Sequence, residues 1–205
     1  MKVIIIDYNT GNIGSILNML RKVGVSAEIS NSPDKIQEAD KLILPGVGHF
    51  DFGMRNLRES GVIPSLTNAV MKEKKPILGI CLGAQLMTQS SEEGIEEGLG
   101  WFNAVTKKIN FDKEINRKIP HMGWTDVFCE KESKLLANMH VNPRFYFVHS
   151  FHMQALDYND VFLTSDYGYK FAAGLERDNI AGVQFHPEKS HKFGKKLLEN
   201  FINEF

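Results

Sequence analysis

Cysteine is scarce in this sequence. The chain has 205 residues and only two cysteines, Cys81 and Cys129, which stand in very different contexts. So few cysteines argue against a disulfide framework and are typical of a reducing compartment. Long apolar runs are also missing: nothing approaches the ~18 residues of a membrane span, and the apolar run at residues 3–6 is too short for a signal peptide. We therefore expect a cytoplasmic protein without a membrane partner.

The sequence also lacks an excess of charge of either sign. Lys and Arg number 24 and Asp and Glu 25, which gives a formal net charge of -1. Without a basic excess or a charged tail, a nucleic-acid partner is not expected. Hydrophobic residues make up 42% and charged residues 24%, an ordinary globular composition whose core needs neither a disulfide nor a metal. We expect one domain over residues 1–205, with no metal or other cofactor.

The pattern of short apolar runs predicts an α/β fold with a mainly parallel sheet. Over the first 90 residues, β-branched runs alternate with segments of helical spacing, as in βαβ units. After Gly100 short strand-like runs dominate, which predicts antiparallel strands appended to the first sheet. A final amphipathic helix is expected from about Ser190. The predicted strands are 3–6, 25–29, 42–44, 76–80, 104–109, 124–128, 144–149, 161–164, 169–176 and 180–185, and the earlier helical segments are 16–24, 54–75 and 82–89.

Cys81 stands at the junction of a predicted strand and a predicted helix. Residues 79–83 read Gly-Ile-Cys-Leu-Gly, which is the nucleophile elbow with Cys in place of Ser. The glycines are needed because the turn is sharp, and a helix N-terminus favours the reactive thiolate. The alternative interpretation is that Cys81 is a buried structural cysteine. A base close to Cys81 would exclude that alternative. Cys129 has no such elbow, and we interpret it as structural or incidental.

His186 is the candidate base. Residues 182–188 read Gly-Val-Gln-Phe-His-Pro-Glu, so the histidine lies just past a strand-like run. In an extended segment, positions i and i+2 face the same side. Glu188 is therefore expected to hold one imidazole nitrogen while the other faces Cys81, as in a nucleophile-base-orienter triad. A surface His-Pro-Glu turn is the alternative.

The loop after the third strand is a candidate oxyanion site. Residues 44–48 read Leu-Pro-Gly-Val-Gly, and glycines free a backbone to aim N–H groups at a ligand. We expect the Leu82 amide, just after the nucleophile, to be one oxyanion donor and the Val47 amide to be the other. Because Gly46 and Gly48 flank Val47, the peptide at Val47 can flip toward the site or away from it.

Taken together, these motifs resemble those of class I (triad-type) glutamine amidotransferases. The motifs are the 45–48 loop, the 79–83 elbow with Gln85, and His186-Pro187-Glu188. Further segments resemble the glutaminase subunits of imidazole glycerol phosphate synthases, so that the resemblance covers essentially the whole chain. These segments are Asp7-Tyr8 with Gly11-Asn12, and residues 120–124, 146–150 and 187–190.

The resemblance implies a three-layer α/β fold and a heterodimer with a separate (β/α)8-barrel synthase subunit of histidine biosynthesis. In such a protein Cys81 attacks the side-chain amide of L-glutamine, His186 protonates the leaving ammonia, and Glu188 holds His186. The residues that would hold the substrate are Gly46, Gly48, Gln85, Glu93, His149, Ser150 and Phe151. The residues that would face the barrel are Asn12, Trp124, Tyr146 and Lys189.

Some residues depart from the pattern of the histidine pathway. Ala84 stands where those enzymes usually have Met, and Phe151 where they often have Tyr. Residues 100–101 and 190–194 are more similar to paralogues in bacterial surface-sugar gene clusters. The departures leave the triad intact. They keep open a second pathway, in which the ammonia is used to amidate a surface sugar.

Two other classes of protein fit the sequence less well. A cysteine protease of related fold would not need Gln85 and the 45–48 loop, which suit a small amide. A metal site would have to use His149 and His152, with Cys129, and the spacing of the two histidines suits a helix, whereas the segment has the pattern of a strand. Residues 11–14 lack the phosphate-binding motifs and are interpreted as a turn.

Overall fold

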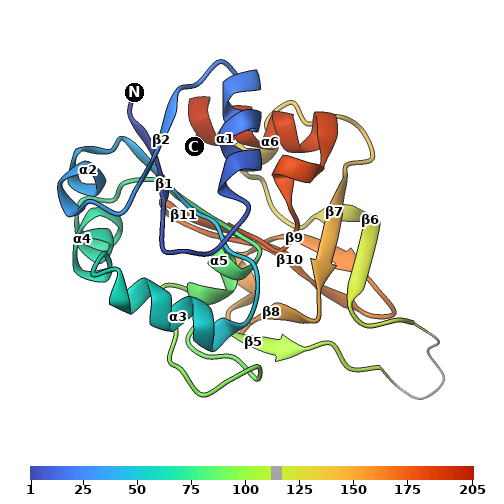
Figure 1. Cartoon of the computed structure of the whole chain (residues 1–205). Coiled ribbons are helices and arrows are strands. Elements are labelled where there is room, and N and C mark those ends of the chain that lie inside the picture. The colour runs from blue at the N-terminus through green and yellow to red at the C-terminus, as the bar shows by residue number, and fades with distance from the viewer. Residues whose placement is uncertain (112–116) are drawn as a thin grey trace.

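The computed structural model describes residues 1–111 and 117–205 (Figure 1). Its strands are β1 (Val3–Ile6), β2 (Ala27–Ser30), β3 (Lys41–Leu44), β4 (Ile77–Ile80), β5 (Ala104–Lys108), β6 (His121–Cys129), β7 (Arg144–His149), β8 (Phe151–Ala155), β9 (Val161–Asp166), β10 (Lys170–Arg177) and β11 (Ile180–Val183). Its α-helices are α1 (Ile13–Lys22), α2 (Pro33–Glu38), α3 (Phe50–Glu59), α4 (Ile63–Thr67), α5 (Leu82–Leu86) and α6 (His191–Asn203). A π-helical turn follows α4 (Asn68–Lys72), and 3-10 turns lie at Lys134–Leu136, Tyr158–Asp160 and Pro187–Lys189.

The strands form a mixed sheet of nine strands in the order β2-β1-β3-β4-β11-β10-β9-β6-β7. The five strands from β2 to β11 are parallel to one another. From β11 to β7 every pair is antiparallel. Strands β5 and β8 form a separate antiparallel ribbon. This is the predicted α/β architecture of a parallel sheet with appended antiparallel strands.

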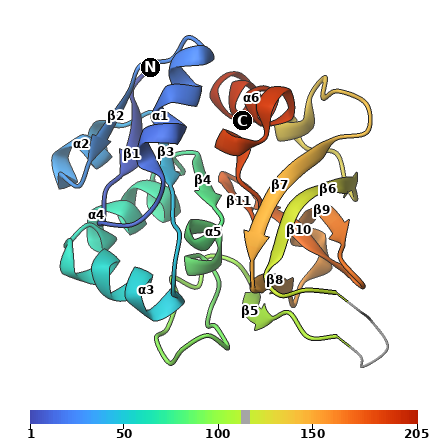
Figure 2. The ribbon, with the colours of Figure 1, turned by 45° about the vertical axis from the view of Figure 1, so that its right-hand side comes forward.

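Helices cover both faces of the sheet, which gives the expected three layers. Helices α1 and α6 lie together on one face, and α2 to α5 lie on the other (Figures 1 and 2). Alternate residues of β1 enter different cores: Val3 and Ile5 belong to the α1–α6 side, and Ile4 and Ile6 to the other. A strand buried on both faces has to be apolar throughout, which is why residues 3–6 are a continuous β-branched run.

The loops at the carboxyl ends of the parallel strands meet at one edge of the sheet, where open α/β sheets bind ligands. Strand β4 lies between β3 and β11. Its last residue is followed at once by Cys81, so the cysteine lies between the loop after β3 and the loop after β11 that contains His186. The fold thus brings the three predicted motifs to the same place.

The predicted elements differ from the observed ones mainly at their ends. Helix α1 begins at Ile13, so the predicted turn at residues 11–14 is wrong in its second half. Strand β2 begins two residues later than predicted, because the Val25 amide donates a hydrogen bond to the Leu20 carbonyl at the end of α1. Helix α2 (six residues) and strand β8 (five residues) were not predicted.

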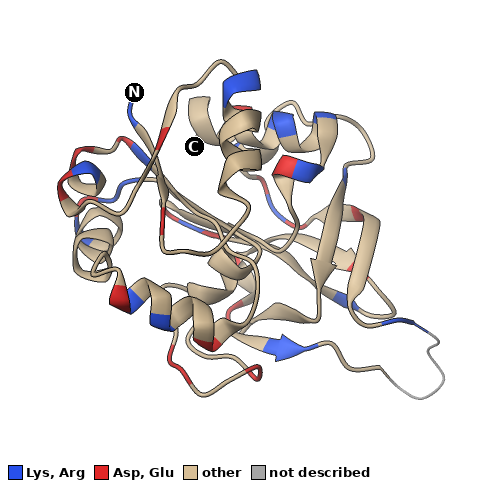
Figure 3. Cartoon of the chain, viewed as in Figure 1, with Lys and Arg blue, Asp and Glu red and all other residues tan. Residues whose placement is uncertain are grey.

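Basic and acidic residues are interspersed over the helices and loops (Figure 3), in line with the net charge of -1. None of the helices in residues 1–111 and 117–205 is both long and apolar enough to cross a membrane.

Gly83 is a position where the fold leaves no room for a side chain. A Cβ there would overlap the Leu44 carbonyl at the end of β3, which is backbone and cannot move aside. We expect Gly83→Ala to lower the free energy of unfolding by about 1–3 kcal/mol, measured by urea denaturation. Gly14→Ala is the matched control, because a Cβ at Gly14 meets nothing within 4 Å in helix α1. An equal loss in both variants would contradict the close approach of α5 to β3.

Candidate active site

Cys81 forms the elbow between β4 and α5. Its backbone has φ 54° and ψ -112°, a conformation that residues with a side chain rarely adopt. The packing of α5 against β4 holds this turn, since a Cβ at Gly79 would lie 2.8 Å from the Ala84 Cα. Helix α5 has only five residues, so the thiol is at the start of a short row of peptide dipoles. Cys81 is buried, with 6% of its surface exposed.

His186 follows β11 and is in contact with Glu188. The imidazole Nδ1 and the Glu188 Oε1 are 2.7 Å apart, and both side chains are 1% exposed. The expectation that an extended segment produces this contact is wrong. Residues 187–189 form a 3-10 turn, closed by the Lys189 amide on the His186 carbonyl at 3.0 Å. Pro187, with its fixed φ, starts the turn that folds the carboxylate back onto the ring.

The environment of His186 favours its protonated form. Burial lowers its pKa, but interactions with Cys81 and Glu188 outweigh burial and raise the pKa to about 10. His186 is therefore charged at neutral pH, and its imidazolium is able to give a proton to a leaving group above Cys81. Among residues 1–111 and 117–205, Nε2 of His186 has no partner with hydrogen-bond geometry. Cys81 and His186 are thus close without a well-formed bond, as is common before a substrate binds.

In the loop after β3, the backbone carbonyl of Gly46 occupies the expected oxyanion site. The Leu82 amide donates to the Gly46 carbonyl, with N and O 3.3 Å apart. The Gly46 carbonyl and the Val47 N–H belong to one planar trans peptide and point in opposite directions. The Val47 N–H therefore points away from Leu82. In this state one expected donor is occupied and the other is turned away.

Tyr8 supports this loop from below. Its buried hydroxyl donates to the Pro45 carbonyl. A Cβ at Gly46 would lie 2.6 Å from that hydroxyl and 2.7 Å from the Gly83 nitrogen. Gly48, at the other end of the loop, has a φ of 105°. Glycine is needed at 46 because of the close approach and at 48 because of the conformation.

A pocket of about 610 Å³ opens over Cys81. The predicted residues Gly48, Gln85, Glu93, His149, Ser150 and Phe151 line it, together with Val47 and Leu82 of the oxyanion site. Of the predicted substrate residues, Gly46 lies outside this lining. Glu188 is also outside, because it is buried behind His186.

Two of the pocket's polar side chains are held by backbone groups. The Gln85 Nε2 donates to the Phe151 carbonyl at 2.9 Å, which ties α5 to strand β8. One carboxylate oxygen of Glu93 accepts from the Phe50 amide at 2.8 Å, at the start of α3. The Gln85 Oε1 and the other carboxylate oxygen of Glu93 can each accept a hydrogen bond from a ligand.

The comparisons with known proteins agree with this geometry. A sequence model of the family described as glutamine amidotransferase class-I matches residues 4–205. The chain belongs to the class I glutamine amidotransferases. Among its relatives, the imidazole glycerol phosphate synthase subunit HisH 2 of Pseudomonas aeruginosa is 50% identical over 98% of both chains. The protein of the same name from Methanococcus maripaludis is 53% identical over 98% of both chains.

Solved structures of lower identity share the fold of this amidotransferase. A structure titled glutamine amidotransferase has a TM-score of 0.72 at 17% identity, over 97% of this chain and 96% of its own. A structure of PurLQS from Thermotoga maritima has a TM-score of 0.69 at 18% identity, over 98% of this chain and 97% of its own.

Three side chains near the active site of the amidotransferase were not predicted from the sequence to belong to it. Gln184 is fully buried, with its Nε2 3.8 Å from the Cys81 sulfur and its Oε1 3.1 Å from the Gln85 Nε2. A polar residue inside the apolar run 180–185 was the available signal. Tyr8, below the oxyanion loop, and His121, beside His149, are the other two.

Of the four residues expected to face a partner, two line the pocket, Tyr146 is a neighbour of Lys189, and Trp124 is a neighbour of Tyr146. Asn12 and Lys189 line the pocket directly. The Lys189 ammonium is 5.8 Å from the centre of the Tyr146 ring, and the Tyr146 and Trp124 rings are 6.4 Å apart. Trp124 is 40% exposed and lies on β6 beside Met122, which is 60% exposed. Lys189, Tyr146 and Trp124 thus form a row of neighbouring side chains that begins at the lining of the pocket.

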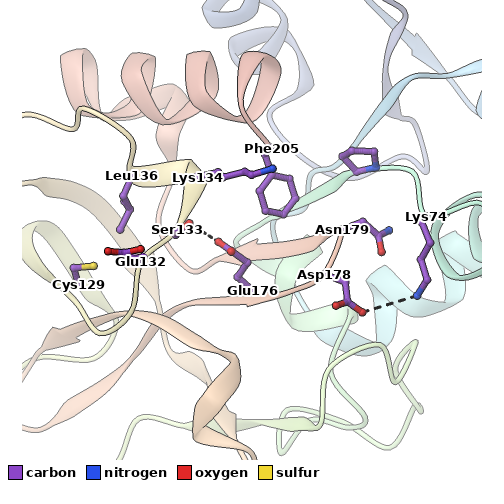
Figure 4. A pocket seen from close by; sticks show the side chains of 11 residues that line it. Lys74, Cys129, Glu132, Ser133, Lys134, Leu136, Glu176, Asp178, Asn179 and Phe205 are labelled. Atoms are coloured by element: carbon purple, nitrogen blue, oxygen red, sulfur yellow. Dashed lines mark hydrogen bonds and ion pairs between the residues drawn. The ribbon is translucent and has the colours of Figure 1, made fainter.

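A larger hollow of about 970 Å³ lies at the opposite edge of the sheet, between Pro76 at the start of β4 and Cys129 at the end of β6 (Figure 4). Ser133 donates to Glu176 in it, and Lys74 pairs with Asp178 at 4.0 Å. None of its described lining residues is a histidine, the usual base beside a cysteine nucleophile. The hollow therefore lacks the Cys-His pair of the candidate active site.

Proposed function

We propose that this amidotransferase is the glutaminase subunit of an imidazole glycerol phosphate synthase. It hydrolyses L-glutamine and passes ammonia to a (β/α)8-barrel synthase subunit. The observation that carries this proposal is identity of 50% and 53% to two proteins of that name over 98% of the chain. The buried His186–Glu188 pair beside Cys81 supports the chemistry.

In the first half of the reaction, the Cys81 thiolate forms a bond to the side-chain amide carbon of glutamine. The carbonyl electrons move onto oxygen, which amides of the oxyanion site stabilise. The C–N bond then breaks, the nitrogen takes the proton of His186, and ammonia leaves a glutamyl thioester. Glu188 keeps the imidazole oriented and favours its charged form.

In the second half, neutral His186 accepts a proton from water as the water attacks the thioester carbon. The C–S bond breaks, glutamate leaves and the thiolate returns. Gln85, Glu93 and the backbone around Ser150 hold the amino-acid end of the substrate in the pocket, so that its amide reaches Cys81.

The oxyanion loop adds a gate to this mechanism. With the Gly46 carbonyl on the Leu82 amide, the negative oxygen of the intermediate would meet a carbonyl instead of two N–H groups. Flipping the Gly46–Val47 peptide removes the carbonyl and brings in the Val47 N–H. We therefore assign the structure to a resting state that a partner has to convert.

The function is tested by assembling the chain with the histidine-pathway barrel subunit of the same organism. We expect glutamate and imidazole glycerol phosphate to form in equal amounts from glutamine and the barrel's substrate. Glutamate release without any use of the ammonia by this barrel would overturn the proposed pathway. Ammonia transfer to the barrel partner of a surface-sugar pathway would instead establish the alternative.

Glu188→Gln keeps the shape of the orienter but removes the charge that stabilises protonated His186. We expect glutamine turnover in the assembled complex to fall about 100-fold, with the thioester still forming slowly. The check is steady-state glutamate release, with Glu93→Gln as a control that should change KM more than kcat. Wild-type turnover in Glu188→Gln would show that the buried pair at 2.7 Å has no part in the reaction.

A further inference from the structure

A second pair of buried histidines lies beside the glutamine pocket. His121 begins β6 and is opposite His149 in β7. They are 1% and 6% exposed, and the mechanism above uses neither imidazole. The His121 ring is stacked between Phe147 and Tyr167, with ring centres 4.8 and 3.9 Å away. The stacking therefore fixes the plane of the ring.

Hydrogen bonds connect these rings in a row. The Thr125 hydroxyl is 2.7 Å from Nε2 of His121, and Nδ1 of His121 is 3.0 Å from Nε2 of His149. Nδ1 of His149 is 2.8 Å from the Phe151 carbonyl. Gly123 lies between His121 and Thr125 with a φ of 136°, where β6 departs from a regular strand.

The end of the row decides where each proton lies. A carbonyl oxygen only accepts, so Nδ1 of His149 must carry a hydrogen. In a neutral ring, Nε2 of His149 then accepts from Nδ1–H of His121. Nε2 of His121 in turn accepts from the Thr125 hydroxyl. This arrangement leaves every ring nitrogen paired, and the opposite order would set a nitrogen lone pair against the Phe151 carbonyl.

Both rings are held in the neutral form that this order needs. Burial, with a smaller effect of Arg117, lowers the pKa of His121 to about 4. Burial, with smaller effects of His121, His152 and His186, lowers the pKa of His149 to about 3, against a small rise from the Phe151 carbonyl. At neutral pH neither ring is charged.

The row ends on the part of the pocket that holds the substrate. The Phe151 carbonyl accepts both from His149 and from the Gln85 Nε2. The Gln85 Nε2 also donates to Gln184, whose own Nε2 lies 3.8 Å from the Cys81 sulfur. The orientation of this carbonyl thus affects Gln85, the side chain at the floor of the pocket.

We infer that His121 and Thr125 are positioning residues for the glutamine pocket: Thr125 holds His121, His121 donates to Nε2 of His149, and the His149 ring is thereby held against the Phe151 carbonyl that also binds Gln85. The inference rests on the proposed glutaminase function. It also connects the pocket with strand β6, whose other face presents Met122 and Trp124 at the surface.

The proton order is tested directly by ¹⁵N NMR of the histidine-labelled chain near neutral pH. Ring nitrogen shifts distinguish Nδ1–H from Nε2–H, and His121→Asn identifies the His121 signals by their absence. We expect His121 and His149 both to be protonated at Nδ1. A His149 protonated at Nε2 would overturn the inference, whatever the catalytic activity of the chain.

The positioning role is tested by kinetics of the complex with its barrel partner. Thr125→Val removes the hydroxyl while keeping the shape, and Thr125→Ser keeps the hydroxyl as a matched control. We expect KM for glutamine to rise about tenfold in Thr125→Val, as loss of one partly buried hydrogen bond allows. We expect little change in kcat, and little change in either constant in Thr125→Ser.

His121 offers a second matched pair. His121→Phe fills the aromatic stack without a donor and should raise KM about tenfold or more. His121→Asn retains an N–H near the position of Nδ1 and should restore most of the affinity. Unchanged KM in both Thr125→Val and His121→Phe would refute the inference. A wild-type complex without glutaminase activity would refute the proposed function instead, and the NMR result would still stand.

Discussion

Cys81→Ser is expected to lower glutamine hydrolysis by roughly 10⁶-fold, the scale seen when the nucleophile of a catalytic triad is removed. A serine hydroxyl is far less acidic than a thiol. His186, whose interactions with Cys81 and Glu188 keep it protonated, is poorly suited to accept the hydroxyl proton. The fold should not change, because serine is no larger than cysteine. The measurement is glutamate release by the complex, with circular dichroism to check folding.

Cys129→Ser is the control for this prediction. Cys129 is exposed and its sulfur donates to the Lys131 carbonyl at 3.0 Å, at the edge of the sheet remote from His186. We expect activity within about twofold of wild type, as for a typical surface substitution. Retention of more than about a tenth of the activity in Cys81→Ser would remove Cys81 from the mechanism.

Addition of the barrel partner with its ligand is expected to raise the glutaminase activity of the chain by about 10²–10³-fold. This is the effect of one oxyanion donor. The isolated chain has the Gly46 carbonyl on the Leu82 amide and lacks the Val47 donor. A partner shifts such an equilibrium only if it binds the flipped state more tightly, and a shift from 1:99 to 99:1 needs about 5.5 kcal/mol. An interface with aromatic and charged anchors can supply that much.

The measurement is steady-state glutamate release by the purified chain alone, then with the barrel, then with barrel and ligand. Lys189→Ala should weaken the activation while leaving the basal rate of the lone chain near its wild-type value. Turnover of about 1 per second or more by the lone chain, unchanged by the partner, would refute the gated loop. Cys81 would keep its role, but the protein would act as an independent glutaminase.

Much of the fold is encoded in short patterns of the sequence. Residues 3–6 had to form a doubly buried strand because every side chain is β-branched, and β1 supplies two residues to each core. Strand β7 was predicted to the residue, since residues 145–148 are a continuous run of aromatic and β-branched side chains. The elbow at residues 79–83 could be predicted because its glycines are required: a side chain at either one would overlap the backbone where α5 packs against β3 and β4.

Other features depend on contacts that no local pattern reveals. The turn at Pro187 brings Glu188 onto His186, although the sequence pattern predicts an extended segment there. The state of the oxyanion loop depends on one hydrogen bond between Gly46 and Leu82, and a flippable peptide has the same sequence in either state. The row from Thr125 to Phe151 requires β6 and β7 to be paired in register before its histidines can meet.

The most direct test of the central claim, that Cys81 attacks the glutamine side chain, is covalent labelling. The complex is treated with a glutamine analogue that has an electrophilic diazoketone in place of the side-chain amide, and the labelled residue is located by mass spectrometry. We predict one label per chain, on Cys81. Labelling should proceed at the same rate as the loss of activity, and added glutamine should slow both. Activity lost with the label on Cys129 or on any residue other than Cys81 would contradict the proposed mechanism.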